Sequence, residues 1–165
     1  MPHWRALGAV SLGLLTGCVR LPPPPGQCVV ATAWSTAYAR QHILATLAPG
    51  QIRVLHYTVI ANPARGRPCG TITLHKQLAV MRGRGDLHIA EVRDFYHGHL
   101  LVAVHTAHIG ARLSSSGRYT SDVTLPIPGN APLGHYTVIS LLYARWGDGP
   151  PILLARSRTH FLVTR

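Results

Sequence analysis

The chain has 165 residues, of which 47% are apolar and 13% are charged. This length fits one domain with short appendages, and the apolar fraction allows a buried core. Lys and Arg total 16 against 5 Asp and Glu, for a formal net charge of +11. So few carboxylates leave little material for paired-carboxylate catalysis. With 3 cysteines and 2 methionines, the chain is neither a Cys-dense scaffold nor a Met-rich copper carrier.

Residues 1–17 have the organisation of a secretory signal peptide. Arg5 gives a positive start, and an apolar stretch over residues 6–15, too short to span a bilayer, leads into Leu15-Thr16-Gly17-Cys18. This tetrapeptide resembles the lipobox of bacterial lipoproteins. The resemblance implies that Cys18 receives a diacylglycerol thioether, that the chain is cut before it, and that its new amine is acylated. The alternative is a plain secretory signal with an accidental cysteine.

The residues after Cys18 predict a tether. Several acyl chains on one residue make a lasting membrane anchor. By the sorting pattern of lipoproteins, Val19 in place of Asp favours the outer membrane, and we expect its periplasmic face. Residues 22–25 are consecutive prolines, which form a stiff polyproline spacer. The expected organisation is therefore a signal peptide over 1–17, a lipidated tether over 18–27 and a folded domain over 28–165.

Two cysteines remain once Cys18 carries lipid. In an oxidising compartment, Cys28 and Cys69 are expected to form a disulfide. The alternative is that Cys69 is a copper ligand with His75 and Met81, at a spacing that loosely resembles the ligand loop of cupredoxins. That alternative fits poorly, because residues 71–80 alternate like a strand.

Beyond the tether the dominant hydrophobic period is two, which predicts strands and an all-β domain. In the last strand, positions 153–163 of odd number form the apolar face and Arg156 and Arg158 lie on the other face. About seven or eight short strands separated by turn signals favour an antiparallel β-sandwich, with a small closed barrel as the rival fold. The expected strands are 29–34, 51–61, 70–80, 87–95, 100–106, 118–125, 134–145 and 151–164, and residues 36–47 fit a helix or a strand.

One passage carries a fold resemblance. Leu125-Pro126, followed by Ala131-Pro132-Leu133-Gly134-His135-Tyr136-Thr137-Val138, is similar to the "LP…P-x-G-x-Y-x-V" passage of immunoglobulin-like sandwiches. The resemblance implies that Gly134 starts the penultimate strand and that Tyr136 packs at a corner of the sandwich. It implies nothing about function.

Histidine is the unusual residue, with 11 in the chain. If residues 97–105 form one extended strand, His97, His99 and His105 lie on one face, opposite Leu100, Val102 and Val104. Neighbouring histidines on that face would be about 7 Å apart, close enough to share a Zn or Cu ion. The simpler interpretation is a solvent-exposed strand face without a metal-binding role. We expect no resident cofactor beyond a weak Zn or Cu site.

The remaining residues favour a protein without catalytic activity. The serines at 114–116 lack a nucleophile elbow, and no nucleotide-binding fingerprint occurs. The arginines are scattered, so nucleic acid is not an expected partner; anionic lipid or another envelope protein is. We therefore expect an outer-membrane lipoprotein with a binding or assembly role. The alternative is a His-rich periplasmic protein that binds Zn or Cu.

Overall fold

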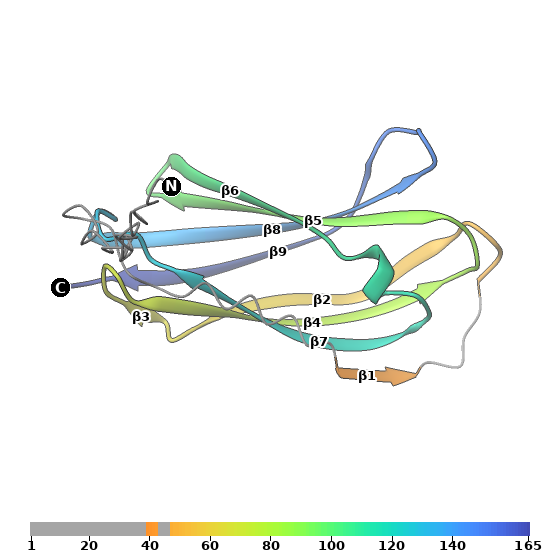
Figure 1. Cartoon of the computed structure of the whole chain (residues 1–165), viewed down its shortest axis with the longest axis horizontal. Helices are drawn as coiled ribbons and strands as arrows, with labels where there is room; N and C mark the ends of the chain where they lie inside the picture. The colour runs from red at the N-terminus through yellow and green to blue at the C-terminus, as the bar shows by residue number, and fades with distance from the viewer. Residues whose placement is uncertain (1–38, 43–46) are drawn as a thin grey trace, which may run out of the picture.

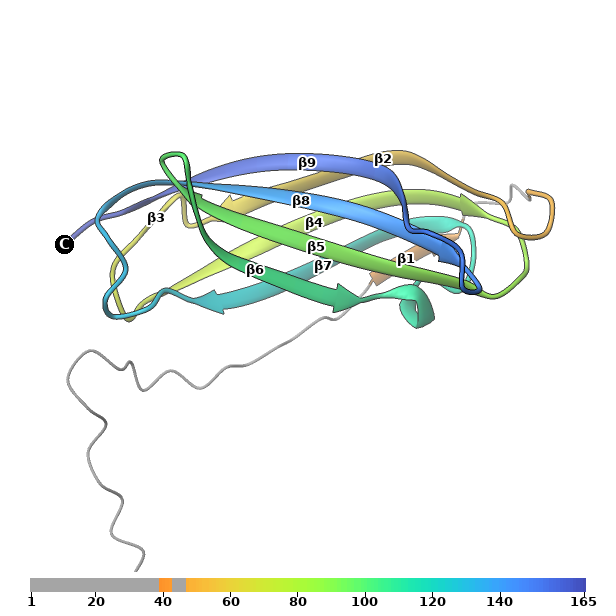
Figure 2. The same cartoon turned by 90° about the horizontal axis from the view of Figure 1, so that it is seen from above.

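The computed structural model describes the backbone of residues 39–42 and 47–165, and side chains from residue 47 onward. Almost all of this part is β-strand, arranged in two sheets that face each other, with a single 3-10 turn over Gly110–Arg112 (Figures 1 and 2). The all-β prediction is therefore confirmed. Within these residues no helix is long and apolar enough to cross a membrane. The expected signal peptide, Cys18, Cys28 and the tether lie outside the described residues.

The first sheet has five strands in the order β3-β9-β8-β5-β6. All neighbours are antiparallel except β3 and β9, which run parallel. Its strands are β3 (Arg65–Gly66), β5 (Leu87–His97), β6 (Leu100–His108), β8 (Gly134–Trp146) and β9 (Ile152–Val163).

The second sheet has four antiparallel strands in the order β1-β7-β4-β2. Strand β2 leads into β3 of the other sheet through the cis Asn62–Pro63 peptide bond. Its strands are β1 (Ala39–His42), β2 (Ile52–Asn62), β4 (Thr71–Arg82) and β7 (Gly117–Pro126).

The strands expected from residue 51 onward all form, with ends shifted by a few residues. The undecided segment 36–47 contains strand β1, and a short strand, β3, forms between the strands expected over 51–61 and 70–80. The strand expected over 29–34 lies outside the described residues. One face assignment is wrong: Leu153 is 49% exposed, because a bulge opposite Leu142 and Tyr143 shifts the pairing of β9 there.

The core lies between the sheets and is built mainly from alternate positions of the strands. In β4 the residues Ile72, Leu74, Leu78 and Val80 are all buried. They belong to two separate apolar clusters, one toward the Ile72 end of β4 and one toward the Val80 end. Lys76, also buried, occupies the inward position between them. The core is therefore interrupted at its middle by charge.

Two tyrosines fasten strand starts to the preceding loops. The Tyr136 hydroxyl, near the start of β8, donates to the carbonyl oxygen of Pro132 at 2.9 Å. The Tyr119 hydroxyl, near the start of β7, donates to the carbonyl oxygen of Ser115 at 2.6 Å. Each bond spans four residues and fixes the direction in which the loop enters the strand.

Candidate functional site: an apolar edge strand and the pocket beside it

The three histidines considered as a weak Zn or Cu site, as the alternative to a solvated strand face, do not share one strand. His97 ends β5, His99 lies in the tight turn after Gly98, and His105 lies in β6. Gly98 has a φ of 60°, which a two-residue hairpin turn requires and which glycine adopts at no steric cost. The segment 97–105 is thus a hairpin and not one extended strand.

The hairpin separates these histidines. His105 pairs with Arg93, while His97 pairs with Leu100 at the turn, so the two imidazoles are offset by about 13 Å along β5. No group of three or more His, Cys, Asp or Glu side chains that could hold a metal occurs in the described part of the chain. The arrangement of these three histidines on one extended strand is therefore wrong.

His97 is instead part of the corner around Tyr136. Its ring lies 5.0 Å from the Tyr136 ring, and its Nε2 lies 3.2 Å from the Leu133 carbonyl oxygen, to which it can donate. A Cβ at Gly134, which has a φ of +133°, would lie 2.9 Å from that nitrogen. Glycine at 134 therefore allows the imidazole to pack against the tyrosine.

Strand β6 is the most unusual surface of the molecule. It ends the five-stranded sheet, and β5 is its only sheet neighbour among the described residues. Its apolar side chains face solvent: Leu100 is 68% exposed and Val104 55%. Leu101 and Val102 are exposed as well. A long apolar edge strand is a template for pairing with another chain, and proteins normally protect such edges with charge, proline or a bulge.

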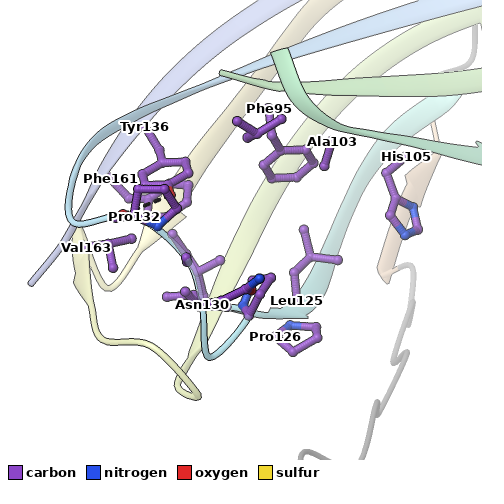
Figure 3. Close-up of a pocket in the computed structure, with 15 residues that line it drawn as sticks. Phe95, Ala103, His105, Leu125, Pro126, Asn130, Pro132, Tyr136, Phe161 and Val163 are labelled. Carbon is purple, nitrogen blue, oxygen red and sulfur yellow. Dashed lines mark hydrogen bonds between the residues drawn. The ribbon is translucent and has the colours of Figure 1, made fainter. Parts of the chain in front are cut away.

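A pocket of about 370 Å³ lies between the two sheets beside β6 (Figure 3). Strand β6 contributes Val102 and His105 to its wall, and β7 contributes Leu125. Tyr136 and Phe161, whose rings stack at 5.0 Å, close it from the first sheet. The walls are mainly apolar, so the pocket suits an apolar or aromatic group.

His105 is the titratable imidazole at this pocket. It is half-buried, and burial together with the nearby positive charge of Arg93 lowers its pKa. Both causes favour the neutral ring. His105 is therefore suited to an apolar surrounding at neutral pH.

The middle of the core holds a network of charges that the sequence analysis did not anticipate. Glu91, the only glutamate, is fully buried and accepts hydrogen bonds from Lys76, the only lysine, at 2.8 Å and from Tyr57 at 2.6 Å. Arg93, also buried, donates a further bond to the same carboxylate. The network joins β2 and β4 of one sheet to β5 of the other.

This network is fixed in one charge state. Burial alone would raise the pKa of Glu91, but the charges of Arg93 and Lys76, together with hydrogen bonds from Lys76 and Tyr57, lower it. Burial and the neighbouring carboxylate raise the pKa of Tyr57. Glu91 therefore stays ionised and Tyr57 stays protonated, which is the behaviour of a structural network.

The sequence held a signal for this network. Lys76 and Glu91 occupy the inward positions of alternating apolar strands, where charged residues are rare unless they are paired. The apolar edge strand β6 had no comparable signal, because the sequence LLVAV is equally compatible with a buried strand and an exposed one.

Cys69 is disulfide-bonded. Its backbone N–H donates to the Ile127 carbonyl oxygen at 3.0 Å, so it lies beside the part of the pocket wall formed by residues 126–128. This bonding state leaves no place for Cys69 as a copper ligand. The expected partner, Cys28, lies outside the described residues, so that pairing stays a prediction.

Comparison with known proteins adds little. No protein-family model and no curated protein matches the chain. Among solved structures, the chain is similar to an alkylpurine DNA glycosylase, AlkC, from Pseudomonas fluorescens, bound to DNA containing an abasic site analogue. The TM-score is 0.41 and the identity 14%, over 72% of this chain and 32% of the glycosylase chain. At this level the likeness carries no argument about function.

Proposed function

We propose that the protein is an outer-membrane lipoprotein, anchored through Cys18 on the periplasmic face, whose β-sandwich binds another envelope protein without catalysis. The observation that carries the binding role is the exposed apolar edge of β6. An uncharged strand that no other described strand covers on its outer edge can recognise an extended apolar segment of a partner, which adds to the sheet as a further strand. Backbone hydrogen bonds give affinity, and the side chains of Leu100 and Val104 give specificity.

We also propose that the sandwich is immunoglobulin-like. Read in chain order, the three longer strands of the second sheet correspond to A, B and E, and β5, β8 and β9 correspond to C, F and G. A tyrosine near the start of strand F that bonds to backbone a few residues upstream is a hallmark of that fold, and Tyr136 with Pro132 matches it. Strand β6 then takes the position of C′, at the end of the C–F–G sheet.

The binding role is tested by placing a photo-crosslinking amino acid at Val104 in the bacterium that makes the protein. Ile60 on β2 is a matched control, because it is also β-branched and 54% exposed against 55% for Val104. We expect a discrete protein adduct from position 104 and none from position 60. Equal labelling from both positions, or adducts with lipid alone, would refute a strand-specific protein partner.

The anchor is tested separately with Cys18→Ala. We expect this variant to incorporate no palmitate label and to accumulate as an unprocessed or soluble form. Label retained in the variant would show that the lipobox assignment is wrong, and it would leave the β6 result unaffected.

A further inference from the structure

The inner face of the first sheet carries a row of polar side chains that crosses the core. In register across four strands, the row consists of His105 (β6), Arg93 (β5), Ser140 (β8) and Ser157 (β9). Directly opposed residues in an antiparallel pair point to the same face of the sheet. Arg93 and Ser140 are buried, so this face is the interior. The row therefore places His105, in the wall of the pocket, directly beside Arg93.

Arg93 has hydrogen-bonding capacity that the buried network does not use. Its side chain is 1% exposed, and its Nη2 donates to the carboxylate of Glu91. Its Nε and Nη1 have no hydrogen-bond partner among the described residues. A buried donor that is left without an acceptor is costly, and bonds between a charged donor and an anion are the strongest. Arg93 is therefore suited to bind a further anionic acceptor.

The interior also holds more positive than negative charge. Lys76 and Arg93 are buried cations, and Glu91 is the carboxylate that they share. The other four carboxylates of the chain all lie within the described residues, and none of them is buried. Charges inside a protein are normally balanced by charges of opposite sign. One further negative charge would therefore balance the interior.

The apolar pocket reaches the neighbours of Arg93 on two strands. On β6 it is lined by His105, the direct partner of Arg93, and on β5 by Phe95, two residues and about 7 Å further along the strand. Burial, together with the charge of Arg93, lowers the pKa of His105, so the guanidinium lies close to that ring. An acidic group bound at the His105 end of the pocket would therefore lie near Arg93.

The rest of the pocket suits an apolar body. Tyr136 and Phe161 lie at the end of the pocket away from His105, with Phe95 between them and β6 (Figure 3). The volume of about 370 Å³ is within the usual range of small-molecule sites. The pocket thus combines an apolar, largely aromatic wall at one end with a buried cation beyond the other.

We propose that the pocket binds a small apolar molecule that carries one carboxylate, of the class of the medium-chain fatty acids. The apolar chain lies against Phe95, Tyr136 and Phe161. The carboxylate lies beside His105, where it accepts a hydrogen bond from the guanidinium of Arg93. The carboxylate balances the buried positive charge, and the chain is removed from water. The ligand lies inside the sandwich, so β6 remains available to a protein partner.

The first test is calorimetric titration of the full chain with two probes of equal chain length, octanoate and 1-octanol. We expect octanoate to bind at least about tenfold more tightly than octanol, because a hydrogen bond to a charged group contributes such a factor. Equal affinities would show that Arg93 does not take part. Absence of octanoate binding at millimolar concentrations would overturn the proposal as a whole.

Variants then locate the site. Arg93→Gln should reduce octanoate affinity to that of octanol, and a folded Arg93→Gln protein that still prefers octanoate would refute the role of the arginine. Because this variant also weakens the buried network, a second pair leaves the network intact. Ala103→Trp places an indole in the pocket wall, whereas Thr106→Trp, opposite the outward Val92, places it on the outer face of the same strand.

We expect Ala103→Trp to lose octanoate binding and Thr106→Trp to retain it. Equal binding by the two variants would show that octanoate binds elsewhere, and it would refute the proposal. Neither titration depends on the anchor at Cys18 or on a protein partner at β6, so its outcome is independent of theirs.

Discussion

The two long sides of the sandwich treat their edge strands differently. Where β2 meets β9, backbone N–H groups of the edge are satisfied across the sheets: Val59 donates to the Ser157 hydroxyl at 2.9 Å and Ala61 to the Thr159 hydroxyl at 3.0 Å. Where β6 and β7 lie, the sheets instead enclose the apolar pocket, and β6 exposes leucine and valine. One side is closed by side-chain hydrogen bonds within the domain, and the other side is suited to receive a chain segment.

This difference between the two sides explains how a small domain can expose an apolar edge strand and still keep its fold. Hydroxyl side chains that bond to an edge strand remove it as a template for other chains. The buried network of Lys76, Glu91 and Arg93 connects the sheets between the two sides. Binding at β6 would therefore leave the closed side and the centre of the core unchanged.

The largest effect on stability is expected from the buried charge network at the centre of the core. Glu91→Ala leaves Lys76 and Arg93 buried without their counter-charge, which should lower the free energy of unfolding by about 3–5 kcal/mol. Urea unfolding followed by circular dichroism measures this loss. A change below about 1 kcal/mol would show that water reaches these charges and that the network does not hold the two sides together.

Acid should weaken the same network. Because the pKa of Glu91 is lowered in the folded protein, its stabilising contribution is complete above the ordinary value of about 4.3 and is lost as the pH falls through the lowered value. The lowered pKa of His105 acts in the same direction below about pH 6.5. Unfolding measured from pH 7 to pH 3 should show both losses, and Glu91→Gln should remove the one at lower pH. An unchanged acid profile in that variant would contradict the assignment.

The sequence predicted the strands but not which of them lie at the edges of the sheets. Alternation gave nearly every strand after residue 51, because each buries one face and follows a period of two. It misplaced His97, His99 and His105 because the turn at Gly98 is a single glycine inside a continuous apolar and histidine-rich run.

The apolar edge strand and its pocket could not be predicted from the sequence, for a different reason. Whether β6 is an edge or an inner strand depends on the order of strands in the sheet, which is a non-local property. The pocket likewise requires residues from β5, β6, β7, β8 and β9 together. The corner tyrosine could be predicted, since Gly134 and Tyr136 are near neighbours in sequence.

A smaller loss of stability is expected when the two hydrogen bonds that link β2 to β9 are removed. Ser157→Ala with Thr159→Val removes the acceptors of the Val59 and Ala61 N–H groups. Each of these two part-buried hydrogen bonds contributes about 0.5–1.5 kcal/mol, so their joint loss should cost about 1–3 kcal/mol, less than Glu91→Ala. Amide hydrogen exchange should then accelerate at Val59 and Ala61 more than in β4. Exchange that stays slow at both positions would show that the hydroxyls do not protect this edge.

Loss of the corner bond should have a moderate effect beside the pocket. Tyr136→Phe keeps the ring stacked on Phe161 but removes the bond to the Pro132 carbonyl oxygen, so stability should fall by about 1 kcal/mol. Tyr119→Phe is the matched variant, with its bond to Ser115 at the start of β7. Thermal unfolding of both proteins tests whether the two corners contribute alike. An unchanged melting temperature in both variants would show that the corner bonds do not stabilise the fold.

The smallest effect on stability is expected at the open edge, where the effect on association should be largest. Val104→Lys places a charge on β6 at a position that is already 55% exposed, so the free energy of unfolding should change by no more than about 0.5 kcal/mol. A charge on an edge strand opposes edge-to-edge pairing, so the crosslinked adduct and any self-association should decrease. Ile60→Lys, at 54% exposure on β2, should match it in stability and leave association unchanged. Chemical denaturation and light scattering on the two variants separate these quantities. If both lysines reduced association equally, net charge and not the identity of the edge would be the cause, and the contrast between the two sides would fail.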